Sequence, residues 1–221
     1  MKQQPRLTVV IPTYHRADNL KRIVPSITKH GFVRQVIVWN NGHEKVGWAQ
    51  KSDRVLFVDS NVCVWGRYLA ALRHTDNDWI GTQDDDYILT NWPEIYETAI
   101  ANPTQIVSAM HAAPNQQSGI QPVGLGWEAM LGWGAVFHRS WIMPTFNPYL
   151  RQYGEDDVLH NEADRLFTIL RGERHVEVKA HANPLPGAGG PTAMHKQDGQ
   201  RRRIGIARCR AIELLKRAKN L

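Results

Sequence analysis

Three consecutive aspartates, Asp84, Asp85 and Asp86, are the residues of this 221-residue chain whose types and spacing most favour chemistry. They follow the short apolar segment 79–82, and carboxylates held this close raise one another's pKa. A divalent cation removes that repulsion, and hard carboxylate oxygens suit Mg²⁺ or Mn²⁺. The ion would neutralise charge on a departing diphosphate. A solvated acidic turn is the alternative, but the place directly after a buried strand favours the metal.

A second acidic group, Glu155, Asp156 and Asp157, follows Gly154 and opens a predicted helix. Such carboxylates can accept the proton of an attacking hydroxyl, or stabilise positive charge that develops at a reacting carbon. The alternative is that these acids only complement the helix dipole, which is worth about 0.3–1 kcal/mol for each. Three acids directly after a glycine exceed that need, so the group is a candidate catalytic site.

Strands and helices alternate through the first half of the chain. Apolar, β-branched runs predict strands at 7–11, 35–39, 54–58 and 79–82. Apolar residues at helical spacing predict helices at 17–29 and 66–73. This order predicts an α/β fold with a mainly parallel sheet and helices on both faces, whose ligands bind beyond the carboxyl ends of the strands. The polar groups expected at that edge are Thr13 to Arg16, Asn40, Asn41, Asn61 and the three aspartates.

The second half of the chain is less regular. We expect strands at 105–109 and 176–179, a helix at 155–170 and a basic terminal helix over 204–215. The segment 183–191 (NPLPGAGGP) is too rich in proline and glycine for regular structure and is predicted to be a mobile loop. We expect this loop, continued to about residue 200, to close over a bound ligand.

Composition and charge narrow the class of protein. Two cysteines form no disulfide framework or metal-ligand spacing, and no apolar run reaches the roughly 18 residues that span a bilayer. The start of the chain, 1–6, is polar where a signal peptide would be apolar. We therefore expect a soluble, cytoplasmic protein. The net charge of +6 favours an acidic partner, although basic surface residues can also serve solubility alone.

Five stretches of the sequence carry a family resemblance: VVIPTYHR (9–16), IVWNNG (37–42), GTQDDDYIL (81–89), GAVFHRSWI (134–142) and EDDVLHN (155–161). Together they resemble glycosyltransferases of the GT-A fold, and specifically the exostosin-like α-N-acetylhexosaminyltransferases. The resemblance implies a Mn²⁺- or Mg²⁺-dependent enzyme that uses a nucleotide-sugar, in the first place a UDP-sugar. It implies a single GT-A domain over 1–221, in which 1–100 binds the nucleotide-sugar, 101–200 holds the acceptor and catalytic groups, and 201–221 is the basic helix.

The resemblance also implies roles for individual residues. Thr13, Arg16 and Asn40 would frame the base, and Asn61 and Arg67 would contact base and phosphate. Asp84 and Asp85 would hold the ribose and the sugar, and Asp86 the metal. The essential aspartate would be Asp157, with Asp156 next and Glu155 beside it. Arg203 would contact the donor phosphates, although the glycines of the late loop depart from the family there, and His195 would complete the metal shell or touch phosphate.

Aromatic and basic residues indicate which kind of acceptor the protein would bind. Trp127, Trp133 and Trp141 lie in or beside a glycine-rich segment and are candidates for stacking on a sugar, with core packing as the alternative. Basic residues gather late in the chain, at Lys196, Arg201, Arg202, Arg203, Arg208, Arg210, Lys216, Arg217 and Lys219. They favour an anionic acceptor, such as an acidic glycan or DNA with hydroxymethylated bases, which bacteriophage sugar transferases modify. A solvated basic helix is the alternative.

Two other functions fit parts of the pattern. A nucleotidyltransferase of the same fold class would make the nucleotide-sugar, but such enzymes carry a glycine-rich basic loop after the first strand, and PTYHRADN has no glycine. A non-catalytic protein that binds nucleic acid or glycan would keep the acids as structural groups. Retention and inversion of the anomeric configuration are both compatible with the sequence.

Overall fold

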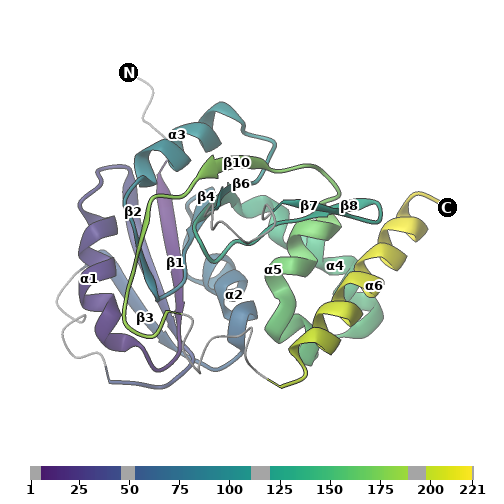
Figure 1. The fold of residues 1–221 in the computed structure, drawn as a ribbon, viewed down its shortest axis with the longest axis horizontal. Coiled ribbons are helices and arrows are strands. Elements are labelled where there is room, and N and C mark those ends of the chain that lie inside the picture. Colours follow the sequence, from purple (N-terminus) through teal and green to yellow (C-terminus); the bar gives the residue numbers. More distant parts are fainter. Residues whose placement is uncertain (1–5, 46–52, 111–119, 189–197, 221) are drawn as a thin grey trace.

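The computed structural model describes residues 6–45, 53–110, 120–188 and 198–220. Its centre is a seven-stranded sheet of order β10-β6-β9-β4-β1-β2-β3 (Figure 1). The strands are β1 (Leu7–Thr13), β2 (Val33–Asn40), β3 (Val55–Asp59), β4 (Trp79–Thr82), β6 (Val107–Met110), β9 (Ala135–His138) and β10 (Val176–Lys179). β9 runs antiparallel to both of its neighbours and the other pairings are parallel. The predicted mainly parallel α/β sheet is confirmed.

Helices cover both faces of the sheet because successive strand residues point to opposite sides. Val9 and Val36 face one core, which contains α1 (Ala17–Thr28) and α3 (Trp92–Ala101). Val10 and Ile37 face the other core, which contains α2 (Gly66–Arg73), α4 (Ile142–Tyr153), α5 (Asp157–Arg171) and α6 (Gln200–Ala218). In Figure 1, α6 packs along α5 at the outer side of this layer.

The start of α2 depends on a close approach between Gly66 and Trp39. Trp39 is buried at the end of β2, and a Cβ on Gly66 would lie 2.1 Å from its indole Nε1. Only glycine fits at this distance, so α2 begins directly against the sheet. This contact sets the place of the next residue, Arg67, which is buried.

Short elements complete the fold. They are β5 (Tyr87–Leu89), β7 (Gln121–Val123), β8 (Gly126–Glu128), β11 (Ala182–Pro184) and the 3₁₀ turns η2 (Cys63–Trp65) and η3 (Arg139–Trp141). β7 and β8 form one antiparallel pair, and β11 and β5 form another.

The expectation of a loop over 183–191 is wrong for its first residues. Asn183 and Pro184 belong to β11, which pairs antiparallel with β5, and Leu185 is buried. A proline is tolerated in such a two-stranded edge because its missing N–H can face away from the partner strand. Residues 189–197 lie outside the described part of the chain. The terminal helix begins at Gln200, earlier than expected, directly after Gly199 with φ +75°.

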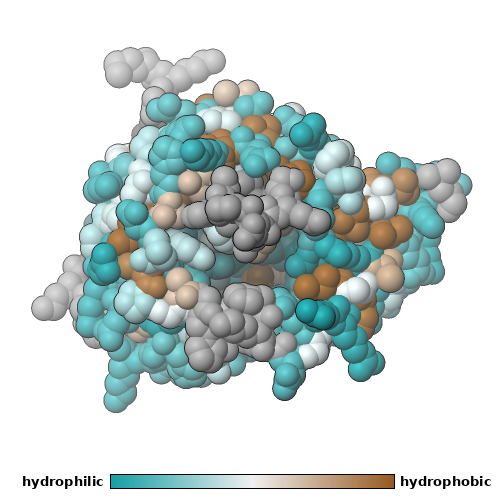
Figure 2. Space-filling view, viewed as in Figure 1, coloured by the Kyte–Doolittle hydropathy of each residue, from teal (hydrophilic) through white to brown (hydrophobic). Residues whose placement is uncertain are grey.

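The surface seen in Figure 2 is mainly hydrophilic, and its hydrophobic residues form small patches, several of them on the side where α6 lies. The same view shows this face hollowed near its centre, between the sheet and α5. Among the described residues, no helix has the length and apolar character needed to cross a membrane.

Candidate functional site

The carboxyl ends of four parallel strands meet at one edge of the sheet. Thr13 at the end of β1 pairs in register with Asn40 of β2, and Asn40 pairs with Asp59 of β3. On the other side of β1, β4 ends at Thr82 and leads through Gln83 into the acidic triplet. The polar groups that the sequence placed at one edge therefore lie together.

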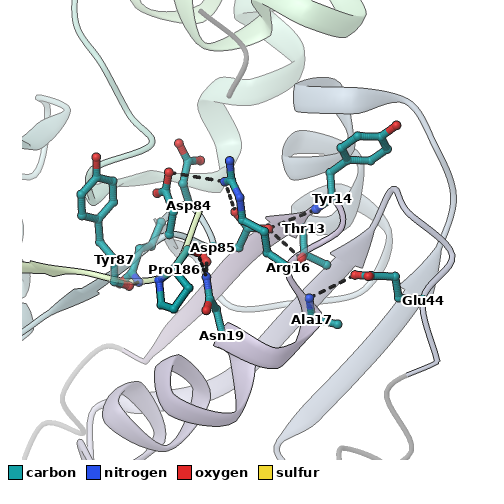
Figure 3. Close-up of polar contacts among 12 residues, drawn as sticks. Thr13, Tyr14, Arg16, Ala17, Asn19, Glu44, Asp84, Asp85, Tyr87 and Pro186 are labelled. Carbon is teal, nitrogen blue, oxygen red and sulfur yellow. Dashed lines mark hydrogen bonds and ion pairs between the residues drawn. The ribbon is translucent and has the colours of Figure 1, made fainter. Parts of the chain in front are cut away.

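Asp85 is the centre of the network at this edge. It is buried and accepts hydrogen bonds from the Thr13 hydroxyl at 2.7 Å, the Tyr14 N–H at 3.1 Å and the Arg16 guanidinium at 2.8 Å (Figure 3). Burial raises the pKa of Asp85, and the contacts with Thr13 and Arg16 oppose that rise. Thr13 and Arg16 thus hold an aspartate of the triplet in place.

Asp86 differs from Asp85 in having one carboxylate oxygen to which no described residue donates a hydrogen bond. Its Oδ2 lies 3.4 Å from Arg16, whereas Oδ1 is buried and has no hydrogen-bond partner in the described part of the chain. Burial, with a further contribution from the Asp84 charge, raises the pKa of Asp86 to about 7. A buried, unpartnered carboxylate oxygen is costly unless a cation or a donor reaches it. Asp86 therefore fits a metal ligand.

Asp84 is bonded to Arg67 of α2 and not to Arg16. Its Oδ1 accepts from Arg67 at 2.5 Å, and its side chain is 42% exposed. The Asp84 N–H donates to the Gly132 carbonyl at 2.7 Å. A Cβ on Gly132 would lie 2.0 Å from the Asp84 carboxylate, so a glycine is required beside this residue.

The segment after β11 lies beside the acidic triplet. The Leu185 N–H donates to the Asp86 carbonyl at 2.8 Å. The Asn19 side-chain amide, in the first turn of α1, donates to the carbonyls of Asp85 at 2.9 Å and Pro186 at 3.0 Å (Figure 3). One asparagine thus fastens the first helix, the triplet and a late segment of the chain together.

Asparagines at the ends of β2 and β3 shape the neighbouring part of the edge. The Asn40 amide donates to the Glu44 carbonyl at 2.9 Å and to Asp59 at 2.6 Å, and the buried Asn41 accepts from the Val62 N–H at 3.2 Å. Asn61 is exposed. Asn40 and Asn41 fix the turns that follow the strands, while Asn61 faces solvent.

The three residues of the second acidic group, Glu155, Asp156 and Asp157, have different contacts. Asp156 is the N-cap of α5, accepts from the Leu159 N–H at 2.9 Å and pairs with Arg210 at 2.5 Å. Asp157, the first residue of the helix, is exposed, and Asn161 donates to its carboxylate at 2.9 Å. Glu155 is exposed beside His160. Asp157 and Glu155 are therefore both open to a ligand, and Asp157 is the one that Asn161 orients from within the helix.

α5 is kinked at Glu162, whose φ and ψ are −117° and 22°. The side chain of Asn161 also donates to the Asp157 carbonyl at 2.9 Å, and such a side chain competes with the helical hydrogen bonds. Glu162 is buried with an unpartnered Oε1, and burial raises its pKa to about 7, against the Arg203 charge. Arg203 itself has a buried Nε and Nη2 without partners in the described residues.

The aromatic candidates for an acceptor site separate in space. The Trp133 ring lies 5.2 Å from the ring of Tyr87, which directly follows the triplet. Trp127 and Trp141 lie instead under Arg174 and Arg171, at the C-terminal end of α5. The structure brings Trp133 to Tyr87 beside the triplet, whereas the ring contacts of Trp127 and Trp141 are with arginines.

Sequence reasoning missed two residues of this site, Asn19 and Asp164, and one of its candidates cannot be placed. His195 lies outside the described residues. Asp164 accepts from Arg67 and from the Tyr68 hydroxyl. Its carboxylate in the helix that the sequence predicts over 155–170 was a signal. Asn19 offered none, because both of its acceptors are backbone carbonyls from distant segments.

Comparisons with known proteins agree with this arrangement. Of the solved structures, TarS of S. aureus is similar, with a TM-score of 0.52 and 12% sequence identity. The likeness covers 82% of this chain and 37% of the TarS chain, and at this identity it concerns the fold. The comparison with curated proteins gave no match. The family model described as glycosyl transferase family 2 matches residues 8–158, which include the triplet and the second acidic group. The chain therefore belongs to glycosyl transferase family 2, whose enzymes transfer sugars from nucleotide-sugars.

Proposed function

We propose that the protein transfers a sugar from a UDP-sugar to an acceptor hydroxyl, with Asp86 as a ligand of Mn²⁺ or Mg²⁺ and Asp157 in the chemical step. The observation that carries this proposal is the buried, unpartnered Oδ1 of Asp86 at the edge where the strands end. Enzymes of the family generally depend on a divalent metal.

The residues of the triplet fit a cation. Asp86 would hold it through Oδ1, and the half-exposed Asp84 carboxylate lies two residues earlier in the chain. Among the described residues, no three His, Cys, Asp or Glu side chains form a group that could hold a metal ion by themselves. Donor phosphates and water would therefore complete the coordination shell of the ion. When bound, the ion supplies positive charge against which the diphosphate leaves.

The remaining donor groups have distinct tasks. Asp85, held by Thr13 and Arg16, is fixed to receive a ribose or sugar hydroxyl. Asn40, Asn61 and Arg67 border the base and phosphate region in this proposal. Arg203 would use its unpartnered Nε and Nη2 for the diphosphate, because buried guanidinium donors without acceptors favour an anion.

Asp157 is the proposed catalytic carboxylate. It is exposed, and Asn161 orients it from the next turn of the helix. An oriented carboxylate can take the proton of an attacking hydroxyl or stabilise positive charge at the sugar carbon. Asp156 has a different set of contacts, since it caps α5 and pairs with Arg210.

The donor sugar is proposed from the resemblance to exostosin-like enzymes, which implies an N-acetylhexosamine, with a hexose as the alternative. A screen of nucleotide-sugars tests both, with and without Mn²⁺, followed by analysis of the products. We expect Mn²⁺-dependent release of UDP from one UDP-sugar. Release of pyrophosphate from a nucleoside triphosphate and a sugar phosphate would instead identify a nucleotidyltransferase, and no turnover of any donor would favour a binding protein.

The acceptor is proposed to be anionic, either an acidic glycan or DNA with modified bases. Several basic residues of the late cluster are already paired: Arg208 with Glu128, Arg210 with Asp156 and Arg217 with Glu213. Arg201 and Arg202 are exposed at the start of α6, next to Arg203. They are the basic residues best placed to meet an acceptor near Asp157.

Salt dependence tests this acceptor class, because binding through phosphate-contacting basic residues weakens steeply with salt. We expect salt-sensitive binding to duplex DNA or to an acidic oligosaccharide, and a loss of that binding when Arg201 and Arg202 are both changed to Glu. Changing Arg22 and Lys29 to Glu is a matched control, since both are exposed, Arg22 on α1 and Lys29 at its C-cap. Salt-insensitive binding, or an equal effect of both pairs, would favour a small neutral acceptor. The cytoplasm is the proposed location.

A further inference from the structure

Arg67 forms a buried bridge between two carboxylates of different elements. Its side chain is 1% exposed, and its guanidinium donates to Asp84 at 2.5 Å and to Asp164. The Tyr68 hydroxyl donates to the other oxygen of Asp164 at 2.9 Å. An arginine withdrawn from water needs such partners, and loss of one leaves a buried charge that is poorly compensated. Burial lowers the pKa of Arg67, but the charges of Asp164 and Asp84 outweigh it and raise the pKa.

The bridge connects the two halves of the site. Asp84 follows β4 at the edge where the donor is proposed to bind, and Asp164 lies in α5. Asp157 begins the same helix seven residues earlier, before the kink at Glu162. The position of α5 relative to the end of β4 therefore depends on contacts that pass through Arg67.

The Asp84 carboxylate has little freedom to adopt another position while the bridge is intact. Arg67 holds one of its oxygens, and Gly132 lies so close that an added Cβ would be 2.0 Å from the other. Its backbone N–H is also bonded to the Gly132 carbonyl at 2.7 Å. Without Arg67 in its place, the carboxylate would lose the contact that orients it.

We infer that Asp164 is a positioning residue for sugar transfer: through Arg67 it fixes the Asp84 carboxylate and the distance of Asp157 from the donor. The effect of Asp164 on catalysis rests on the proposed function, whereas its effect on the position of Asp84 is independent of that function. Asp164 itself is bonded to Arg67 and Tyr68 and acts through them rather than on the substrate.

Kinetics of graded variants test the inference. Asp164→Ala removes the anchor, and we expect kcat/KM for the donor to fall by at least about tenfold, because small displacements of reacting groups are costly to rate. Asp164→Asn keeps the shape and one acceptor oxygen, so its loss should be smaller. Tyr68→Phe removes only the hydrogen bond of Tyr68 to Asp164 and should show the smallest loss.

A matched control separates positioning from general destabilisation. Glu128→Gln removes a buried carboxylate that binds Arg165, the neighbour of Asp164 in α5, from the strand β8. Like Asp164→Ala, this substitution weakens an ion pair of α5. The pair of Glu128 and Arg165, however, does not connect α5 with the triplet. At a temperature well below the melting points of both variants, an equal loss of kcat/KM in Glu128→Gln and Asp164→Ala would overturn the inference.

Crystal structures of the wild type and the Asp164 variants give a readout without activity. We expect one Asp84 conformer bonded to Arg67 in the wild type, and a displaced or multiple Asp84 carboxylate in Asp164→Ala. If the wild type turns over no nucleotide-sugar, the proposed function fails while this comparison still decides the role of Asp164. An Asp84 carboxylate that keeps its place in Asp164→Ala would overturn the inference. If the alanine variant does not fold, the same comparison is made with Asp164→Asn.

Discussion

The guanidinium of Arg16 lies 2.8 Å from the carboxylate of Asp85, so these two residues neutralise each other at the end of the sheet. Arg67 does the same for Asp84. The third aspartate, Asp86, is 3.4 Å from Arg16 and keeps a buried oxygen without a partner in the described residues. Three adjacent carboxylates of one sequence motif thus differ in their partners, and Asp86 is the one that we propose as a ligand of the cation.

The stability of the metal-free protein should fall as pH rises from about 4 to about 7. The pKa of Asp86 is about 7 in the folded protein and 3.8 as the ordinary value, so the folded state binds more protons in this range and deprotonation disfavours it. Mn²⁺ binds the carboxylate form, so it should raise the melting temperature more at pH 8 than at pH 5. Thermal unfolding at both pH values, with and without Mn²⁺, measures this.

Asp86→Asn is the control for that experiment. It should reduce the pH-dependent loss, of which Glu162 contributes another part, and it should remove the stabilisation by Mn²⁺. Glu162→Gln should leave the Mn²⁺ effect intact, although the pKa of Glu162 is also raised to about 7 by burial. Stabilisation by Mn²⁺ that is equal at the two pH values would contradict the assignment of Asp86.

Asp157→Asn should lower kcat with little change in donor affinity. The substitution keeps the size of the side chain and its contact with Asn161 but removes the charge, and loss of a general base typically costs about 10²-fold or more. Steady-state kinetics and a donor titration check this. Near-normal turnover would move the catalytic role to Glu155 or Asp156.

Asp156 should matter for stability instead. Asp156→Ala removes the N-cap of α5 and the partner of Arg210, and loss of a cap alone costs about 1 kcal/mol. Asp156→Asn keeps the cap and should be milder. Denaturant unfolding measures both variants, and an Asp156→Ala protein as stable as the wild type would refute the assignment.

Trp133→Ala should raise the KM for the acceptor, because its ring lies beside Tyr87 at the triplet. Trp127→Ala should lower stability without a specific effect on that KM, because this tryptophan packs against the core and Arg174. Acceptor kinetics of the two variants, compared at matched fractions of folded protein, distinguish the roles. Equal acceptor KM values would remove Trp133 from the acceptor site.

The sequence predicted well what is local in the chain. The bounds of β4 (Trp79–Thr82), α2 (Gly66–Arg73) and β10 (Val176–Lys179) agree with the expected segments, because apolar periodicity and polar ends mark such elements. The shared edge of the sheet followed from the strand order. What failed or was missed depends on contacts between distant segments: β11 pairs with β5, and Asp164 meets Arg67 from 97 residues away.

Titration of UDP into the protein in the presence and absence of Mn²⁺ examines the metal-dependent donor site without requiring the acceptor or the sugar. The wild type should bind UDP tightly only with Mn²⁺, and Asp86→Ala should lose that difference while folding normally. Asp18→Ala is the matched control, because Asp18 is a fully solvated carboxylate on α1 that pairs with Lys21, and it should bind as the wild type does. Unchanged Mn²⁺-dependent binding of UDP by Asp86→Ala would contradict the proposed site.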